Sequence, residues 1–154
     1  MEFVPGELRI EVCRASDVID LRHEVLRAGL PRETAIFAGD DDASTRHFLA
    51  RWKGRNVGCA TLQFNAWQEQ PAGQRRGMAV VQSLRRHGIG TRLLRAVDES
   101  VRGNSSTCLL WCNARTSAIP FYASQGWQTT CAPFDIPDAG PHVKMIRRYP
   151  TSEI

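Results

Sequence analysis

The stretch that decides the fold runs Gly77-Met78-Ala79-Val80-Val81-Gln82-Ser83-Leu84-Arg85-Arg86-His87-Gly88-Ile89-Gly90-Thr91. Its first residues are continuously apolar and predict a buried strand. The glycines that follow allow a tight turn, and apolar residues at helical spacing after Gly90 predict a helix. A strand, a glycine loop and a helix in this order point backbone N–H groups and the positive end of the helix at one place. The stretch therefore predicts a site for a phosphate or pyrophosphate.

The charge around this loop also favours an anionic ligand. Arg85, Arg86 and Arg92 place mobile positive charge beside it, and residues 43–97 hold ten Arg or Lys but only Glu69 as an acid. The whole chain has a formal net charge of +4. A solvated basic surface is the alternative interpretation. A nucleic-acid binder ranks low, because neither a recognition helix nor an aromatic RNA-binding signature is found, and we expect no nucleic acid as partner.

Two common phosphate loops do not match. The stretch lacks the G-x-x-x-x-G-K-[ST] spacing of a Walker loop, and the dinucleotide pattern G-x-G-x-x-G fails because Leu93 stands in place of the third glycine. The anion site must therefore belong to another family of glycine loops.

The segments before the loop predict strands and one helix. Residues 8–12 alternate between apolar and charged side chains, as a half-buried strand does. Ser16 is a plausible N-cap for a helix that Gly29 and Pro31 end. Residues 47–52 and 57–64 read as strands joined by a connection short enough for an antiparallel hairpin.

The segments after the loop complete the prediction. Residues 107–112 are apolar throughout, as expected of a parallel strand in a βαβ unit. A short helix follows with Pro120 in its first turn and Gly126 after its end. Residues 127–134 and 142–147 predict a last pair of strands. With neither repeats nor linkers, the fold class is α+β and residues 1–154 form one domain.

Composition excludes several classes of protein. The chain has 154 residues, 42% hydrophobic and 23% charged, which rules out a disordered tail or a disulfide-stapled miniprotein. No apolar run approaches the ~18 residues that cross a bilayer, and the first residues do not resemble a signal peptide. We expect a cytoplasmic protein with no membrane partner. Five scattered cysteines without a C-x-x-C pair predict reduced thiols and no metal site.

Two motifs in the right order carry a resemblance to a known family. Arg85-x-x-Gly88-x-Gly90 resembles the [Q/R]-x-x-G-x-[G/A] pyrophosphate loop of the GNAT superfamily of acetyl-CoA-dependent N-acetyltransferases. Ala118-x-x-Phe121-Tyr122-x-x-x-Gly126-Trp127 resembles a later segment of the same family, and Pro141-His142-Val143-Lys144-Met145 resembles the last strand of small bacterial members. The resemblance covers roughly residues 8–147. One departure is Arg115, where much of the family has an Asn that contacts the cofactor.

The resemblance implies a GNAT fold and a binding mode for acetyl-CoA. The fold would be a mixed central sheet of about six to seven strands flanked by helices, with a βαβ acetyl-CoA-binding core. Arg85, Arg86, His87, Gly88, Ile89, Gly90 and Thr91 would bind the pyrophosphate. Met78, Ala79 and Val80 would pair with the pantetheine arm as a partial extra strand. The N–H near Val80 would also stabilise the developing oxyanion.

The resemblance further implies that Tyr122 is the general acid that protonates the departing CoA thiolate. A phenol with an ordinary pKa near ~10 does this only with help from its environment. The alternative is that Phe121 and Tyr122 simply fill space, as an aromatic pair on a short helix usually does. Within the matched segment we favour the catalytic interpretation.

The general base is the catalytic role that the sequence assigns least clearly. A substrate amine is mostly protonated at neutral pH and must lose a proton before it attacks. No carboxylate lies on the strand before the glycine loop, so His142 is the leading candidate for base or substrate contact; a histidine that only hydrogen-bonds in a strand pair is equally compatible. Glu33 and residues 40–42 either bind or deprotonate a cationic substrate or are ordinary solvated carboxylates.

The function predicted is transfer of an acetyl group from acetyl-CoA to a primary amine of a small molecule or peptide, by direct attack in a ternary complex. The partners expected are a CoA thioester and an amine, and homodimers are common in the family. One alternative is transfer of a different acyl group. Another is a CoA-binding sensor or interaction module without turnover, motivated by the missing base and by Arg115.

Overall fold

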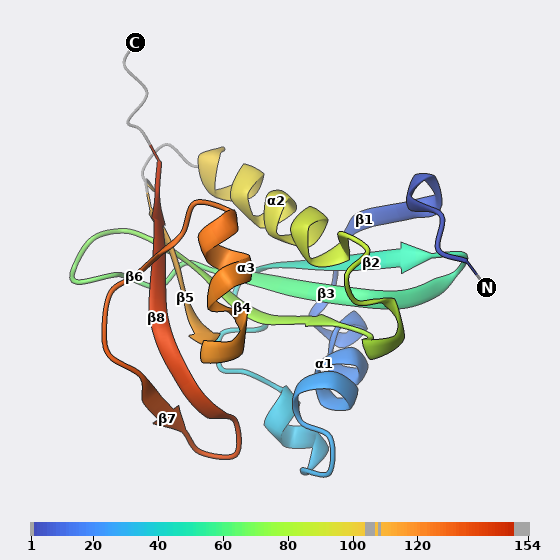
Figure 1. The fold of residues 1–154 in the computed structure, drawn as a ribbon, viewed down its shortest axis with the longest axis horizontal. Helices are drawn as coiled ribbons and strands as arrows, with labels where there is room; N and C mark the ends of the chain where they lie inside the picture. The colour runs from blue at the N-terminus through green and yellow to red at the C-terminus, as the bar shows by residue number, and fades with distance from the viewer. Residues whose placement is uncertain (1, 104–106, 108, 150–154) are drawn as a thin grey trace. The chain divides into compact units, whose positions relative to one another are not determined.

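The computed structural model describes residues 2–103, 107 and 109–149. The chain divides into two compact units, the first made of Met1–Gln63 and Arg75–Ser100 and the second of Phe64–Gln74 and Val101–Ile154. Figure 1 shows the helices and strands of each.

The first unit is built on antiparallel strands. β1 (Leu8–Cys13) pairs with β2 (Arg46–Trp52), which pairs with β3 (Arg55–Gln63). The predicted hairpin is confirmed, and its turn is tight because Lys53 and Gly54 both have positive φ, as two-residue hairpin turns require. β4 (Gly73–Val80) is the neighbour of β3. β4 starts earlier than the apolar run of the sequence, which begins at Gly77.

Two helices cover opposite faces of this sheet (Figure 1). The helix α1 (Ile19–Leu26), with Val18 before it, packs against the face that carries Leu49 and Cys59. The helix α2 (Ile89–Arg102) packs against the other face, where a Cβ on Gly58 would lie 2.9 Å from Leu93 Cδ1 and 3.1 Å from Ile89 Cγ2. α1 begins later than predicted, because Ala15–Asp17 form a 3-10 turn first.

The second unit is organised around its longest strand, β8 (Gly140–Arg148). β8 pairs antiparallel with β5 (Leu109–Arg115), β6 (Gln128–Thr129) and β7 (Phe134–Ile136). The helix α3 (Ile119–Ser124) has Pro120 in its first turn, and Gly126 follows its end with φ of 91°, as predicted. The first residues of β4 belong to this unit and pair in parallel with β5 at Gly73 and Gln74.

The strand order confirms the fold class. In the described part of the chain, eight strands are hydrogen-bonded in the order β1-β2-β3-β4-β5-β8-β6, with β7 also on β8. Parallel and antiparallel pairs both occur, and the helices flank the strands, so the chain has the α+β fold expected. The strand predicted over residues 127–134 is wrong in one respect: it is interrupted, because β6 ends at Thr129 and Pro133, which has no N–H to donate, precedes β7.

Candidate functional site

The predicted glycine loop connects β4 to α2 as expected. After β4, the Val81 N–H donates to the Val57 carbonyl at 3.0 Å, and Gln82–Leu84 form a single 3-10 turn whose Leu84 is buried. The chain then turns through the left-handed region at Arg86 (φ 68°) and Gly88 (φ 82°) before α2 begins at Ile89. The local structure is therefore a strand, a turn anchored by Leu84 and a helix N-terminus.

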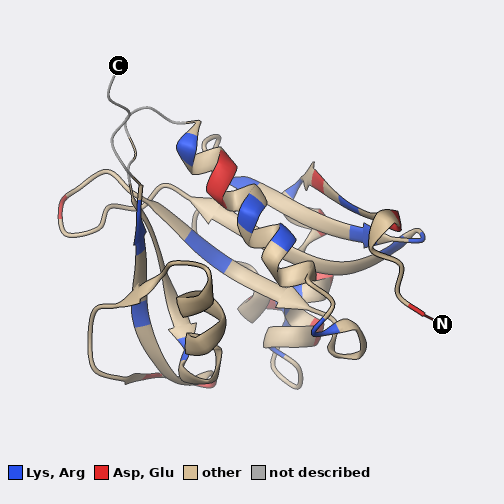
Figure 2. Cartoon of the chain, turned by 45° about the horizontal axis from the view of Figure 1, so that its top comes forward, with Lys and Arg blue, Asp and Glu red and all other residues tan. Residues whose placement is uncertain are grey.

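The loop is open to an anionic ligand. Arg85, Arg86, His87 and Gly88 are all exposed. A Cβ placed on Gly88 would meet nothing within 4 Å, so the space above it is free. The first turn of a helix leaves N–H groups without intrahelical acceptors, and α2 is 14 residues long, so its N-terminus favours negative charge. In Figure 2 blue segments mark the loop and the first half of α2.

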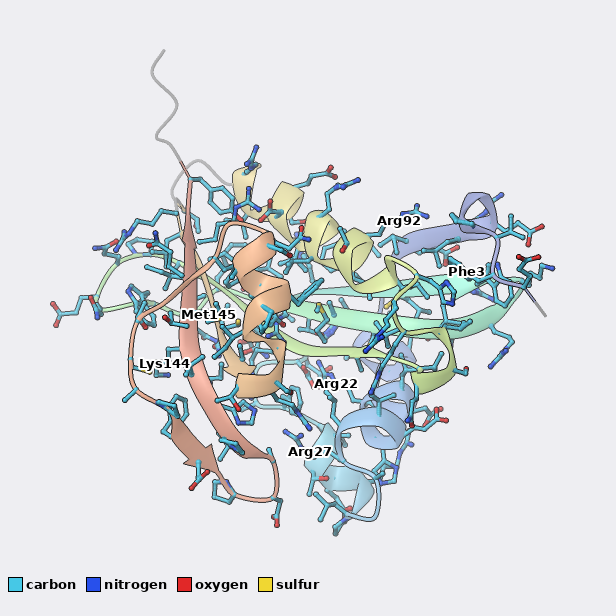
Figure 3. The ribbon with its side chains drawn as sticks, viewed as in Figure 1. Phe3, Arg22, Arg27, Arg92, Lys144 and Met145 are labelled. Carbon is cyan, nitrogen blue, oxygen red and sulfur yellow. The ribbon has the colours of Figure 1, made fainter. Side chains whose placement is uncertain are left out.

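The N-terminal segment of the chain supports this loop. The Phe3 ring lies 5.1 Å from the His87 ring and 5.2 Å from the Trp52 ring, centroid to centroid. The Arg92 guanidinium donates to the Leu8 carbonyl at 3.0 Å (Figure 3). The expectation that Arg92 adds mobile positive charge to the loop is therefore wrong, because its side chain is held by a backbone carbonyl of the N-terminal segment.

The predicted pantetheine-binding residues lie at the end of β4. Ala79 is buried, whereas Met78 and Val80 are half-buried. In the described part of the chain the parallel ladder of β4 with β5 comprises Gly73 and Gln74, so Met78 and Val80 lie outside it. Their backbone groups on β4 are the ones that the resemblance assigns to pantetheine.

A buried arginine is the main feature that the sequence did not predict. The Arg22 side chain is fully buried and makes a two-pronged ion pair with Asp40, at 2.7 Å and 3.0 Å. It also donates to Thr61 Oγ1 at 2.7 Å and to the Ala35 carbonyl at 3.0 Å. The one available signal was its spacing, since Arg22 is four residues after Val18 on the apolar face of α1.

Asp40 is consequently neither solvated nor available to a cationic substrate. Burial alone raises the pKa of a carboxyl, but hydrogen bonds from Arg22 and from the Phe37 N–H outweigh it, and the pKa of Asp40 lies below its ordinary value. His47 adds to this effect; its Nε2 lies 2.9 Å from the Asp40 carbonyl and its Nδ1 2.8 Å from Thr61 Oγ1. Asp40 is therefore an ionised partner of Arg22 at neutral pH.

Glu33 lies in a 3-10 turn formed by Arg32–Ala35 and is exposed. The same turn supplies the Ala35 carbonyl that accepts from Arg22. Glu33 is thus two residues from Ala35, which belongs to the buried network around Arg22. Its role as a substrate contact stays a prediction.

Tyr122 lies in an aromatic group of the second unit. It is 4% exposed, and its ring makes edge-on contacts with Phe121 at 5.1 Å and Trp127 at 5.3 Å, centroid to centroid. These contacts fix the ring, which suits packing and a positioned acid equally. Its role as general acid stays a prediction.

His142 lies on β8 and is buried, with Phe134 and Arg115 as its partners across the sheet. Its Nδ1 lies 2.7 Å from the Gly140 carbonyl. A carbonyl only accepts hydrogen bonds, so this contact assigns the proton to Nδ1 and leaves the lone pair of neutral His142 on Nε2. Nε2 is the atom that would take a proton if His142 is a base, and that role too stays a prediction.

The described cysteines are free thiols: Cys13, Cys59, Cys112 and Cys131. Burial raises the pKa of Cys59 to about 12 and that of Cys13 to about 11. A thiol with so high a pKa is a poor nucleophile at neutral pH, which argues against a covalent acetyl group on either residue. Cys108 lies outside the described residues.

Among the described residues, no group of three or more His, Cys, Asp or Glu could hold a metal ion. Within the same residues no helix is both long and apolar enough to span a bilayer.

Comparison with known proteins decides the family. The family model of the acetyltransferase (GNAT) domain matches residues 43–129, which is more than half of the chain. The chain belongs to the GNAT acetyltransferases. Over 151 residues it is 28% identical to YitI of Bacillus subtilis (strain 168), an uncharacterized N-acetyltransferase, with 94% of this chain and 99% of YitI covered.

Solved structures agree on the fold of this GNAT protein. Escherichia coli ElaA has a TM-score of 0.76 at 18% identity, covering 92% of this chain and 99% of ElaA. A GNAT family acetyltransferase from Elizabethkingia anophelis, with acetyl-CoA bound, has a TM-score of 0.68 at 15% identity, covering 92% and 98%. The resemblance to the GNAT superfamily that the two motifs carry is confirmed. The protein is an acyltransferase enzyme of a family that uses acetyl-CoA.

Proposed function

We propose that this enzyme transfers the acetyl group of acetyl-CoA to a primary amine of a small molecule or peptide, by direct attack in a ternary complex. The observation that supports this most is the open glycine loop between β4 and α2 in a GNAT chain. We also propose that residues 1–154 act as one acetyltransferase domain, since the match at residues 43–129 takes in parts of both units.

The cofactor-binding proposal follows the geometry of the loop. The pyrophosphate would bind the backbone N–H groups of residues 85–91 and the N-terminus of α2, with Arg85 and Arg86 adding charge-assisted hydrogen bonds. Pantetheine would pair with the backbone of Met78 and Val80, which lie outside the β4–β5 ladder. The N–H near Val80 would polarise the thioester carbonyl.

The chemistry requires two proton transfers. The neutral amine nitrogen forms a bond to the thioester carbon, the C–S bond breaks, and the CoA sulfur leaves as a thiolate. The amine's proton would go to Nε2 of His142, directly or through water, and Tyr122 would donate its phenolic proton to the thiolate. Both residues are buried and their rings are held by neighbours, so neither needs to reorganise during the reaction.

Calorimetric titration with acetyl-CoA, desulfo-CoA and ATP tests the cofactor site. We expect micromolar binding of both CoA ligands and none of ATP. In Gly88→Trp the indole would fill the free space above the loop and abolish binding. Gly54→Trp is the matched control, since Gly54 also has positive φ (76°) and open space around it but lies in the β2–β3 turn. If wild type fails to bind CoA, the acetyltransferase proposal is wrong.

Steady-state kinetics test the two proton carriers. Tyr122→Phe keeps the aromatic packing and removes the acid, so kcat should fall by about 10²-fold or more while the KM for acetyl-CoA is unchanged. His142→Gln should lower kcat, because the group that accepts the proton of the amine is then missing. A Tyr122→Phe variant with wild-type kcat would show that the ring only fills space.

The remaining alternatives have their own readouts. Competition among acyl-CoA thioesters for the same site would reveal a preference for a different acyl group. Transfer or hydrolysis above background with a broad amine panel would exclude a CoA sensor without turnover. Light scattering at several concentrations would show whether the protein is a homodimer.

A further inference from the structure

Three arginines of the first unit surround one aromatic ring. The guanidinium carbon lies 4.1 Å from the Phe37 ring centroid for Arg22, 4.6 Å for Arg76 and 5.7 Å for Arg27. Such distances are those of cation–π contacts. Figure 3 shows Arg22 and Arg27 on the α1 side of β4. We call Arg22, Arg27, Arg76 and Phe37 the Phe37 cluster.

The Phe37 cluster brings three guanidinium groups to one ring. Asp40 is an acid beside it, and both of its carboxylate oxygens accept hydrogen bonds from Arg22. Arg76 is half-buried, and among the described residues no carboxylate lies within 4.0 Å of it. Its hydrogen bond to Gln63 Oε1 is long, at 3.5 Å. Burial, and then the charge of Arg22, lowers the pKa of Arg76, and the nearby charge of Asp40 offsets this only in part.

The cluster adjoins the strand segment that we assign to the acetyl-bearing arm of the cofactor. Arg76 and Gly77 directly precede Met78 on β4. Gly77 has φ of 56°, and a Cβ on it would lie 2.7 Å from Arg22 Nε and 3.0 Å from Phe37 Cε2. Because Gly77 has no side chain, Arg22 and Phe37 can pack directly against the β4 backbone, one residue from Met78.

We propose that the acceptor amine carries a carboxylate, as an amino acid does, and that Arg76 binds it. This inference rests on the proposed function, because it places the acceptor beside the acetyl group. A carboxylate matches the planar donors of a guanidinium and would give Arg76 an acidic partner within hydrogen-bond distance. Polyamines and aminoglycosides carry only positive charge, and the excess of arginine repels them.

A panel of matched acceptors tests the substrate class. Release of free CoA thiol is measured with each standard L-amino acid, with its amide, and with putrescine, ethanolamine and O-phosphoethanolamine. We expect kcat/KM for the best amino acid to exceed that of its amide by about tenfold or more. The amine of an amide loses its proton more readily, so basicity cannot produce this preference. Equal rates for the amide, or a preference for putrescine or O-phosphoethanolamine, would overturn the proposal.

Variants of Arg76 test the residue. Arg76→Gln should raise the KM of the preferred amino acid about 10- to 100-fold, leave the KM of acetyl-CoA unchanged and leave the amide unaffected. Arg76→Lys keeps the charge but loses the planar fork, and should lie between wild type and Arg76→Gln. Arg95→Gln, an exposed arginine of α2, is the control and should behave as wild type. An unchanged KM in both Arg76 variants would refute the assignment.

Direct binding separates this inference from the proposed function. The protein is titrated with the N-acetyl derivatives of the same amino acids, without CoA, and heats are compared for wild type and Arg76→Lys. Binding that weakens in the variant would support the carboxylate site even if acetyl-CoA did not bind. If acetyl-CoA binds but no amino acid is acetylated and no N-acetyl derivative binds, the carboxylate inference fails while the cofactor site stands.

Discussion

Two groups of arginines in the first unit differ in their exposure to water. Arg85 and Arg86 of the glycine loop are exposed, so water and salt screen their charge and they cost little in the folded protein. Arg22 is fully buried and Arg76 half-buried, so their charges have lost water and depend on what surrounds them. Identical side chains are therefore loosely held and screened in one place and strongly constrained in the other.

The difference also concerns what each group does for stability. Among the residues that the structure describes, no carboxylate lies within 4.0 Å of Arg85 or Arg86, so their removal should leave folding intact. Arg22 is compensated by Asp40, which is 18 residues away in sequence. The pair therefore ties the loop before β2 to α1, and with Thr61 it ties both to β3.

The largest expected effect comes from removing the compensating acid. Asp40→Asn leaves Arg22 buried without a counter-charge and should lower the free energy of unfolding by about 3–5 kcal/mol. Urea denaturation at pH 7 measures it. Asp41→Asn, the exposed neighbour, should change stability by less than about 0.5 kcal/mol. If the free energy of unfolding falls by the same small amount in both variants, the buried arginines are no more constrained than those of the glycine loop.

A smaller loss is expected at Gly77. Gly77→Ala adds a methyl group 2.7 Å from Arg22 Nε at a positive φ, and should cost about 2–3 kcal/mol. Gly54→Ala also has positive φ but meets nothing within 4 Å, so it measures the backbone strain alone, about 1 kcal/mol. Denaturation of both variants gives the difference. Equal losses would mean that the Phe37 cluster does not press against β4.

The sequence predicted the loop well because its signal is local. The apolar run, Gly88 and Gly90 and the spaced apolar residues of α2 lie within one continuous stretch, and each fixes the conformation of its own neighbourhood. The same holds for the hairpin turn at Lys53 and Gly54 and for the short helix that starts near Pro120. These elements appear in the structure within a few residues of their predicted bounds.

The Phe37 cluster escaped prediction because its signal is not local. Arg22, Phe37 and Arg76 come from α1, a loop and β4, and only the folded chain brings them to one ring. Asp40 was expected to be solvated because most loop carboxylates are. Nothing within residues 40–42 distinguishes the one that pairs with Arg22 from its two exposed neighbours.

The loop arginines should affect binding rather than folding. Replacing Arg85 and Arg86 together by Gln should weaken acetyl-CoA binding about tenfold in low salt, and the difference from wild type should shrink as salt screens the remaining charge. The stability should change by less than about 0.5 kcal/mol. Calorimetry at two salt concentrations and urea denaturation check both parts. An equal loss of affinity at both salt concentrations would show that these arginines contact acetyl-CoA away from water, where salt does not screen their charge.

The pH dependence of stability gives the finest distinction. Because the pKa of Asp40 is lower in the folded protein than its ordinary value of 3.8, its ion pair stabilises the fold fully well above pH 3.8. That stability is lost as the pH falls through 3.8 towards the folded pKa. The difference in unfolding free energy between wild type and Asp40→Asn should thus be constant from pH 7 to 5 and roughly a few tenths of a kcal/mol smaller at pH 4. Other carboxylates titrate in both proteins and cancel in this difference. A difference that grew towards low pH would mean that Asp40 binds its proton more readily in the folded state, and that Arg22 does not hold it ionised.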